Sequence, residues 1–328
     1  MTRIFSGIQP SGELHIGNYL GAVKNWVALQ QRFESFYCIV DYHAITVEYE
    51  PAALRERTRD MAISILASGV DPARSILFVQ SAVPEHTELA WIFNSVAPLG
   101  ELERQTQFKD KSSRQESIAV GLLTYPVLQA ADILLYQADE VPVGADQRQH
   151  VELTRDLAQR FNTRFGDTFT LPRATLPEAG ARVMDLQLVD KRMAKSVESP
   201  QGKILLGESE DETRRKVMRA VTDSGAEVRA AADKPGVSNL LDLMAAVTGT
   251  DIAALEAHFD GKGYGDFKRE VAEAVNAYLR PVRSRYAELR TDPAMVEESL
   301  RKGAGKARAV AAETMEAVRD RVGLLPRA

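Results

Sequence analysis

A polar, glycine-bearing segment near the N-terminus, residues 6–18, carries groups that suit the binding of a phosphate. His15 and Asn18 are three residues apart, so on a helix they share one face, and both can donate to a phosphate oxygen. Gly17 has no side chain, so a flat ring could approach the backbone there. The segment follows an apolar run, residues 3–8, and leads into a helical pattern, where free N–H groups favour an anion. The spacing predicts an anion site, although a capped helix start with an incidental histidine fits it equally well.

A second segment, residues 190–197, places Lys191, Arg192 and Lys195 within five positions of a polar, turn-rich stretch. Such a loop could close over a triphosphate and neutralise the charge that develops on a leaving pyrophosphate. When the segment is taken alone, a solvated basic loop is the better explanation. Together with the first segment, it favours a nucleotide site in which the first segment is a rigid anion site and the second supplies mobile cations.

A single carboxylate, Asp132, interrupts the apolar helical run of residues 130–136. A carboxylate on an apolar face must find a hydrogen-bond donor, because its burial is otherwise costly. The donor is either a neighbouring protein group, as in a buried cap or ion pair, or the N–H of a ligand.

Other motifs are excluded. The glycines of residues 261–265 lack dinucleotide-loop spacing and do not follow a strand, and residues 302–306 lack the pattern of a phosphate loop. The five histidines show no metal-ligand spacing, so no metal site is expected. Cys38 is the only cysteine, which excludes an intrachain disulfide and predicts a buried, inert thiol.

The elements that must position these groups alternate in the first half of the chain. Apolar runs at residues 3–8, 36–41 and 75–80 predict strands, and helical patterns at 17–32 and 51–68 separate them. This alternation is typical of a parallel sheet with helices on both faces.

The middle of the chain is less regular. Residues 117–136 form a long apolar helical pattern with a kink or break expected at Pro126, and residues 139–144 predict a short strand. Residues 146–162 predict a helix with Asp146 as its N-cap. After residues 165–184, which are expected to be a connection, strand signals nearly vanish. Helices are predicted at residues 211–221, 238–247, 251–258, 264–290 and 293–322.

Composition fits a globular protein of roughly two domains: 328 residues, 45% hydrophobic and 27% charged. The formal net charge of −5 makes a nucleic-acid-coating protein an unlikely class, although the last 28 residues hold 7 basic and 3 acidic side chains. We expect a cytoplasmic protein, because no apolar stretch approaches a membrane span or a signal peptide.

Taken in order, the motifs resemble those of the bacterial tryptophanyl-tRNA synthetases along nearly the whole chain. Residues 5–12 and 15–18 are similar to the family's HIGH-type signature, and residues 192–196 correspond to its KMSKS loop. Further similar stretches are residues 100–104, 106–112, 121–126, 130–136, 141–147, 150–156, 220–224 and 234–241.

The resemblance implies an α/β fold: a Rossmann-like parallel sheet in a catalytic domain (1–184, with the ATP and tryptophan sites and a dimer interface) and a smaller all-helical C-terminal domain. It also implies a KMSKS-type loop (185–205), a helical anticodon-binding domain (206–292) and a C-terminal helix (293–328) that could pack back on the catalytic domain. The partners implied are L-tryptophan, tRNA(Trp) and a second copy of the chain in a homodimer, with no membrane.

The resemblance further implies a two-step ligase reaction. Tryptophan's carboxylate attacks the α-phosphorus of ATP and releases pyrophosphate, and the terminal adenosine of tRNA(Trp) then accepts the tryptophanyl group. The attacking carboxylate is already ionised, so positioning and charge stabilisation must supply the catalysis. Mg²⁺ is expected to arrive with ATP, and not in an all-protein site.

The family's site positions map onto this chain as follows. The residues implied to be catalytic are His15, Asn18, Lys111, Arg192, Lys195 and Ser196. The residues implied to bind ATP are Gln9, Pro10, Ser11, Gly17, Asn18, Gly144, Ala145, Asp146, Val183, Arg192, Met193, Ala194, Lys195 and Ser196. The residues implied to bind tryptophan are Asp132, Phe5, Gly7, His43, Tyr125, Gln129, Val141, Val143 and Gln147. Lys111 should reach the phosphates.

In this scheme Asp132 is an unpaired carboxylate that accepts the indole N–H. A ring without an N–H would leave it buried and unsatisfied, and such sites reject analogues by ~10⁴–10⁵. Phenylalanine should therefore fail, with no need for an editing domain.

The sequence departs from the family pattern in two places. Arg192 and Ala194 stand where the KMSKS loop usually has lysine and serine, which predicts slower adenylation because a hydroxyl and a compact ammonium are lost. Gln129 stands where many bacterial members have methionine, and it could offer an amide contact in the amino-acid pocket.

Three other functions stay open at this point. A tyrosyl-tRNA synthetase shares the fold and the reaction, but its pocket should present partners for a phenol hydroxyl. A weakened paralogue could bind tryptophan or a partner without catalysis, and the altered loop favours it. A small-molecule adenylyltransferase would leave the helical half without a role.

Overall fold

The computed structural model describes residues 1–106, 108, 118–144, 147–175, 183–194 and 200–326. Its centre is a five-stranded parallel sheet in the order β3-β2-β1-β4-β5. The strands are β1 Arg3–Ile8, β2 Glu34–Ile39, β3 Ile76–Val79, β4 Glu140–Pro142 and β5 Arg173–Thr175. The chain builds outward from β1 to β3 and then returns to the other side of β1, as in doubly wound nucleotide-binding folds.

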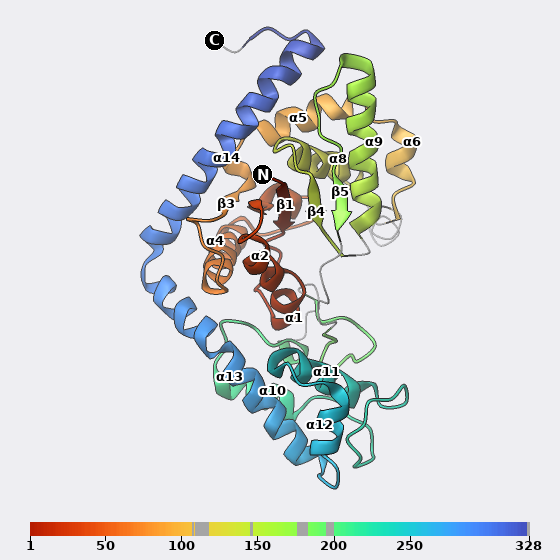
Figure 1. The fold of residues 1–328 in the computed structure, drawn as a ribbon, viewed down its shortest axis with the longest axis vertical. Coiled ribbons are helices and arrows are strands. Elements are labelled where there is room, and N and C mark those ends of the chain that lie inside the picture. Colours follow the sequence, from red (N-terminus) through yellow and green to blue (C-terminus); the bar gives the residue numbers. More distant parts are fainter. Residues whose placement is uncertain (107, 109–117, 145–146, 176–182, 195–199, 327–328) are drawn as a thin grey trace.

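Helices cover both faces of the sheet (Figure 1). In the first half they are α1 Ile16–Asn18, α2 Lys24–Leu29, α3 Asp41–Ala44, α4 Pro51–Ala67, α5 Glu85–Asn94, α6 Leu99–Glu103, α8 Val120–Leu134 and α9 Arg148–Phe165. A π-helical segment, Tyr19–Val23, joins α1 to α2, and short 3₁₀ turns occupy Gln80–Ala82 and Pro200–Gly202.

Alternate side chains of the strands build two cores, because successive residues of a strand point to opposite faces. Ile4, Tyr37 and Leu77 pack with the α1–α2 segment and α4. Phe36 and Phe78 face the other way and pack with α5, α8, α9 and the C-terminal helix. Cys38 on β2 belongs to this second core, and its thiol is fully buried, as predicted.

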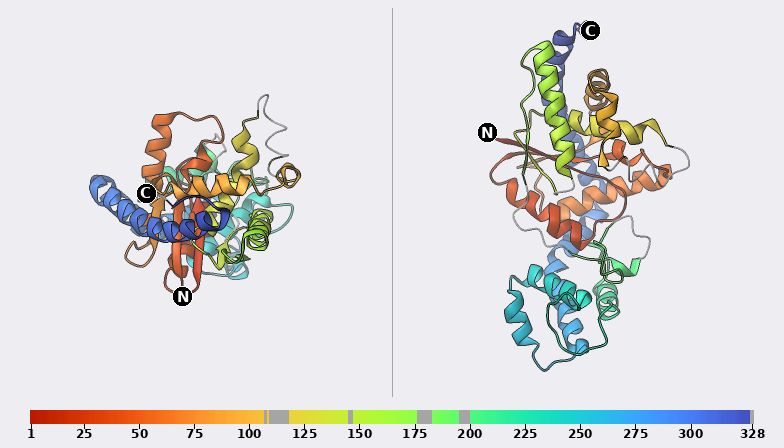
Figure 2. Two further views of the ribbon diagram at one scale, coloured as in Figure 1. Left: turned by 90° about the horizontal axis from the view of Figure 1, so that it is seen from above. Right: turned by 90° about the vertical axis from the view of Figure 1, so that its right-hand side faces the viewer.

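The C-terminal part is helical: α10 Glu210–Met218, α11 Pro235–Thr248, α12 Ile252–His258, α13 Tyr264–Thr291 and α14 Pro293–Val322. Figure 2 shows this helical part at one end of an elongated molecule. Helix α13 packs on α10 and α11 within it and on α4 of the first half, so it connects the two parts.

Helix α14 returns along β3, the edge strand of the sheet, and along α5 (Figure 1). A Cβ on Gly303 would lie 1.8 Å from the Leu77 carbonyl oxygen, so this glycine lets the helix lie directly against the edge strand. The rejected phosphate-loop motif is thus part of a packed helix. The basic side chains of Arg308 and Arg319 form ion pairs with Glu85 and Glu88 of α5.

The predicted α/β architecture with a helical C-terminal region is confirmed, and β1 has the predicted bounds. Two expectations were wrong. Helix α8 continues through Pro126, so the helix does not break there, and the kink that was the other expectation stays a prediction. Residues 173–175, expected to lie in a connection, form β5. Short edge strands carry little periodicity, which explains the omission. The N-cap of α9 is Gln147, and not the expected Asp146, which lies outside the described residues. No helix in the described part of the chain combines the length and apolarity that crossing a membrane requires.

Candidate active site

The sheet order identifies one edge as the place for a ligand. The order in which the strands are added changes direction between β1 and β4, and open parallel sheets bind ligands at such a point, beyond the carboxyl ends of the strands. The loop that contains His15 follows β1, and Val143 and Gly144 follow β4. His43 and Gln80 lie just beyond the ends of β2 and β3. Four strands therefore bring their functional candidates to the same edge.

The His15–Asn18 turn is held by backbone and cap contacts. His15 is the N-cap of α1, and its Nδ1 accepts a hydrogen bond from the Asn18 N–H at 3.3 Å. The Ile16 N–H donates to the carbonyl of Ile204 at 2.8 Å, so the segment that follows the basic loop supports the turn. His15 is almost fully buried, whereas Gly17 and Asn18 are half-buried.

The beginning of the basic segment meets this turn. Met193 is buried, and a Cβ built on Gly17 would lie 3.6 Å from the Met193 Cβ. The Met193 N–H donates to the Val183 carbonyl at 3.1 Å, and Met184 pairs with Arg192 in an antiparallel bridge. The Arg192 side chain is exposed. The structure thus brings two segments some 180 residues apart in sequence into contact.

Asp132 is at the centre of a buried hydrogen-bond network. Its Oδ1 accepts from Gln80 Nε2 and from His86 Nδ1, each at 2.6 Å, and its Oδ2 accepts from His43 Nε2 at 2.8 Å. The expectation of an unpaired carboxylate was therefore wrong, because three protein donors already satisfy most of its lone pairs. None of the three is a lysine or arginine.

The charge state of Asp132 follows from this network. Burial by itself raises the pKa of the carboxyl, but the hydrogen bonds from His43 and His86 outweigh burial and lower the pKa to about 2. The carboxylate is therefore ionised at neutral pH and acts only as an acceptor.

A second line of polar contacts extends from His43. Its ring lies edge-on to Tyr125, whose hydroxyl contacts His150 Nε2 at 3.2 Å. His150 Nδ1 in turn contacts Gln147 Oε1 at 3.0 Å. Burial raises the pKa of Tyr125 to about 12, so its hydroxyl stays neutral. These contacts connect three residues of the expected tryptophan pocket, Tyr125, His43 and Gln147.

The remaining expected pocket residues lie on the same elements. Gln129 is half-buried on α8, and it shares a helix face with Tyr125 and Asp132 because the spacings are four and three. Phe5 is buried on β1 and Val141 on β4, whereas Gly7 at the carboxyl end of β1 is exposed. Val143 follows β4 and is half-buried.

The expected nucleotide residues divide into described and undescribed groups. Gln9 and Ser11 are exposed beyond β1, Pro10 is buried between them, and Val183 is buried beside Met193. Ala194 is half-buried. The expected site residues that lie outside the described residues are Lys111, Ala145, Asp146, Lys195 and Ser196.

Sequence reasoning missed four polar residues of the network: Gln80, His86, Tyr136 and His150. One usable signal was the position of Gln80 directly after a buried strand, since such positions meet at the ligand edge of a parallel sheet. Tyr136 is four residues after Asp132, and so on the same helical face. Nothing in the sequence indicates that His86 faces Asp132, because that contact depends on how α5 packs on α8.

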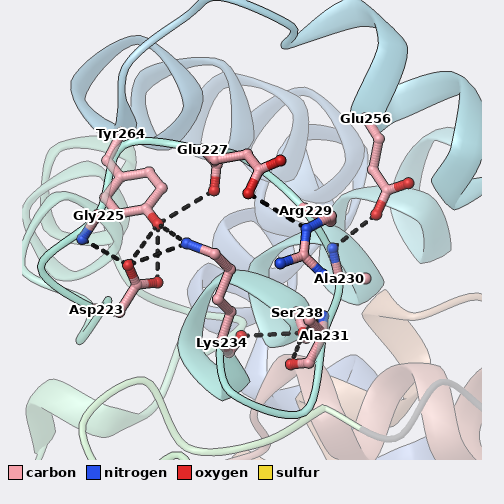
Figure 3. A network of polar contacts seen from close by, with 10 residues as sticks. All are labelled: Asp223, Gly225, Glu227, Arg229, Ala230, Ala231, Lys234, Ser238, Glu256 and Tyr264. Atoms are coloured by element: carbon pink, nitrogen blue, oxygen red, sulfur yellow. Dashed lines mark hydrogen bonds and ion pairs between the residues drawn. The ribbon is translucent and has the colours of Figure 1, made fainter.

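A second polar cluster lies in the helical part (Figure 3). Asp223 accepts from the Tyr264 hydroxyl at 2.8 Å, from Lys234 Nζ at 3.1 Å and from the Gly225 N–H at 2.7 Å. The hydrogen bond from Tyr264 is the main cause of a pKa of about 2 for the Asp223 carboxyl. A Cβ on Gly236 would lie 2.0 Å from the Val221 carbonyl oxygen, so the two stretches of the family pattern, 220–224 and 234–241, are packed together here.

This geometry suits the activation of an amino acid by ATP. The described residues provide a buried acceptor for a ring N–H and, at the same sheet edge, a helix start beside an exposed cation. They contain no group of three or more histidine, cysteine or carboxylate side chains placed to hold a metal.

Known proteins agree with this geometry. Residues 1–280 match the sequence model of the family described as tRNA synthetases class I (W and Y). The chain belongs to this family. The synthetase is 54% identical to tryptophan–tRNA ligase 2 of Streptomyces avermitilis, an alignment that covers 99% of this chain and 97% of that protein. It is 48% identical to the tryptophan–tRNA ligase of Clostridium acetobutylicum, covering 98% of this chain and 97% of that protein.

Solved structures of the family superpose closely on the synthetase. Tryptophanyl-tRNA synthetase from Mycoplasma pneumoniae gives a TM-score of 0.89 at 37% identity, covering 99% of this chain and 98% of that one. The enzyme from Campylobacter jejuni complexed with ADP and tryptophan gives 0.87 at 38% identity, covering 98% and 100%. The predicted resemblance is confirmed, and the protein is an aminoacyl-tRNA synthetase that uses ATP.

Proposed function

We propose that this synthetase is a tryptophan–tRNA ligase. It joins L-tryptophan to ATP, giving tryptophanyl-adenylate and pyrophosphate, and then transfers the tryptophanyl group to the terminal adenosine of tRNA(Trp). Relatives of this name about half identical along the full chain support the amino-acid assignment. The solved relative complexed with ADP and tryptophan supports both small substrates.

The observation that carries the proposal is the Asp132 carboxylate. An ionised carboxylate offers about four lone-pair positions, and the described residues fill three of them. The second position on Oδ2 is left for a donor, and an indole N–H is such a donor. Phe5, Val141 and Tyr125 on neighbouring elements supply the apolar and aromatic surface that an indole ring requires.

The nucleotide side of the site is proposed to be the His15–Asn18 turn and the segment that begins at Arg192. The turn presents the N-terminus of a helix, and Arg192 supplies an exposed cation next to it. Lys111, Lys195 and Ser196 are proposed to complete the phosphate contacts. Mg²⁺ is proposed to enter as part of the nucleotide substrate.

The larger partners follow from the same assignment. We propose that residues 206–292 contact the anticodon arm of tRNA(Trp), residues 1–184 form the catalytic domain and the protein acts in the cytoplasm where its substrates are. We also propose a homodimer, because large apolar side chains of α5, α6 and α8 are exposed to an extent that an interface would explain. These are Trp91, Leu99 and Val120, which are 76%, 60% and 74% exposed.

Amino-acid-dependent ATP–pyrophosphate exchange tests the function. Tryptophan should support exchange, and tyrosine and phenylalanine should not. Charging of tRNA(Trp) transcripts with labelled tryptophan then tests the second step. Exchange that depends on tyrosine would identify the other amino acid of the family, and tryptophan binding without exchange would identify a non-catalytic paralogue. Sedimentation of the purified protein tests the homodimer.

A further inference from the structure

Two buried side chains, His86 and Tyr136, contact the Asp132 network but lie behind it. His86 is fully buried, and each of its ring nitrogens has a partner: Nδ1 contacts Asp132 Oδ1 at 2.6 Å and Nε2 contacts the Tyr136 hydroxyl at 2.7 Å. Tyr136 is also fully buried. Neither residue is among the groups that face the substrates in the proposed function.

The direction of these hydrogen bonds follows from the ionised carboxylate. Because Asp132 only accepts, His86 must carry its proton on Nδ1. In the neutral form of the ring, Nε2 is an acceptor, and the Tyr136 hydroxyl donates to it. Burial raises the pKa of Tyr136 well above its ordinary value, which keeps this donor protonated. The order of donation is therefore Tyr136 to His86 to Asp132.

The surroundings fix both side chains. The Tyr136 ring stacks on Phe36 with centroids 4.6 Å apart and on Phe5 at 5.6 Å, and Phe78 meets its edge at 5.5 Å. Asp132 and Tyr136 are four residues apart, at the end of α8 and just beyond it, so a single His86 ring reaches both. The carboxylate is thus oriented from a rigid aromatic core.

The two carboxylate oxygens of Asp132 therefore differ in the number of hydrogen bonds that they accept. Gln80 and His86 fill both lone pairs of Oδ1, whereas His43 is the one described donor to Oδ2. Rotation of the carboxylate would break the two bonds on Oδ1. The free lone pair therefore has a fixed place on Oδ2.

We propose that His86 and Tyr136 are positioning residues for amino-acid selection. Tyr136 fixes the tautomer of the His86 ring, and His86 fixes the orientation of the Asp132 carboxylate, so that one lone pair of Asp132 Oδ2 points to the indole N–H. The proposal rests on the proposed function, since it assigns the source of that site's preference for a ring N–H.

The test compares two substrates that differ in the N–H alone: tryptophan and β-(3-benzothienyl)alanine, in which sulfur replaces the ring N–H. Tyr136→Phe removes the hydroxyl and keeps the stacked ring. The ratio of kcat/KM values for the two amino acids in ATP–pyrophosphate exchange should fall about tenfold in this variant, the scale of one weakened hydrogen bond to a charged group. The loss should lie in the KM for tryptophan, and the analogue's constants should change little.

Tyr37→Phe is the matched control. Tyr37 is equally buried, stacks on Trp26 with centroids 4.5 Å apart and donates its hydroxyl to the Trp26 carbonyl at 2.8 Å, but it belongs to the other core. The Tyr37→Phe variant should have a lower free energy of unfolding, but its ratio of kcat/KM values for the two amino acids should not change. If Tyr136→Phe leaves the ratio within about twofold of the wild type, or lowers both substrates equally as a structural lesion would, the proposal is overturned.

A second measurement needs no activity. In protein labelled with ¹⁵N at its five histidines, the ring signals assigned through His86→Gln should show a proton on Nδ1 of His86 and none on Nε2. A proton on Nε2 would overturn the proposal even if Tyr136→Phe failed to fold. Failure of the function itself has a different signature, because the wild type would then give no exchange with tryptophan.

Discussion

The two sides of the candidate site are built in different ways. On the tryptophan side, a buried carboxylate is fixed by side chains from three other elements, inside an aromatic core. On the nucleotide side, the His15–Asn18 turn is fixed by backbone contacts to residue 204, and its cation Arg192 is exposed. The difference matches the ligands: a ring N–H is selected by one directed acceptor in a dry site, whereas phosphates are held by several adaptable donors.

The largest effect is expected for Asp132→Asn. The new amide would place an N–H against donors that now converge on the carboxylate, and the acceptor for the indole would be weakened. We expect kcat/KM for tryptophan in ATP–pyrophosphate exchange to fall about 10²–10³-fold, with the KM for ATP much less affected.

Asp223→Asn is the control for this change, because Asp223 lies in the helical part and also has a lowered pKa. It should leave exchange with tryptophan near the wild-type rate. Equal losses in the two variants would show that any removed aspartate charge has this effect, and the contrast between the two sides would be lost.

Gly17→Ala tests the nucleotide side. A Cβ at this position would lie 3.1 Å from His15 Nδ1 and 3.2 Å from its Cε1, so the His15 ring must move. We expect the KM for ATP to rise about tenfold while the KM for tryptophan stays near its wild-type value, since small displacements of positioning groups are costly.

Gly21→Ala is the matched control, because a Cβ on Gly21 would meet nothing within 4 Å. It should behave as the wild type. A rise in the KM for tryptophan, and not for ATP, in Gly17→Ala would place the turn on the wrong side of the site.

Acid unfolding tests the contribution of Asp132, on the tryptophan side, to stability. The folded-state pKa of Asp132 is lowered from 3.8 to about 2, so this group contributes stability above its unfolded pKa and loses it as the pH falls toward 2. The contribution at neutral pH is about 2 kcal/mol. The free energy of unfolding, measured in urea for the wild type and Asp132→Asn, should therefore converge as the pH falls through this range.

Added salt should distinguish the contribution of Asp132 to the free energy of unfolding from that of Asp223. Asp223 also has a pKa of about 2, but its side chain is 24% exposed, so its stabilisation should weaken in about 0.5 M salt. The Asp132 contribution should not. If the contribution of Asp132 also weakened in salt, the network around Asp132 would not be shielded from solvent, contrary to the structure.

The smallest effect is expected for Ala194→Ser. The half-buried Ala194 follows Met193, and a hydroxyl there restores a hydrogen-bonding group next to the proposed phosphate site. Exchange should accelerate about threefold, with the KM for tryptophan unchanged. An unchanged rate would show that the hydroxyl has no role in this protein.

The sequence alone predicted the parts of the molecule whose signal is local. The bounds of β1 and the order of strands and helices follow from short-range periodicity, as does the helical character of the C-terminal half. Ordered motifs likewise predicted the family and indicated His15, Arg192 and Asp132 as site candidates. The edge strand β5 was missed because its three residues, Arg173–Thr175, are only partly buried and contain no apolar run.

Tertiary structure alone decided which side chains meet. Spacing cannot show that Gln80, His86 and His43 all converge on Asp132, because they come from segments 46 to 89 residues away and depend on how α5, α8 and the strand ends pack. The sequence placed a carboxylate on an apolar face. Folding decided that it is held by three donors with one acceptor position left, because long-range packing directs side chains that local pattern can only place on a face.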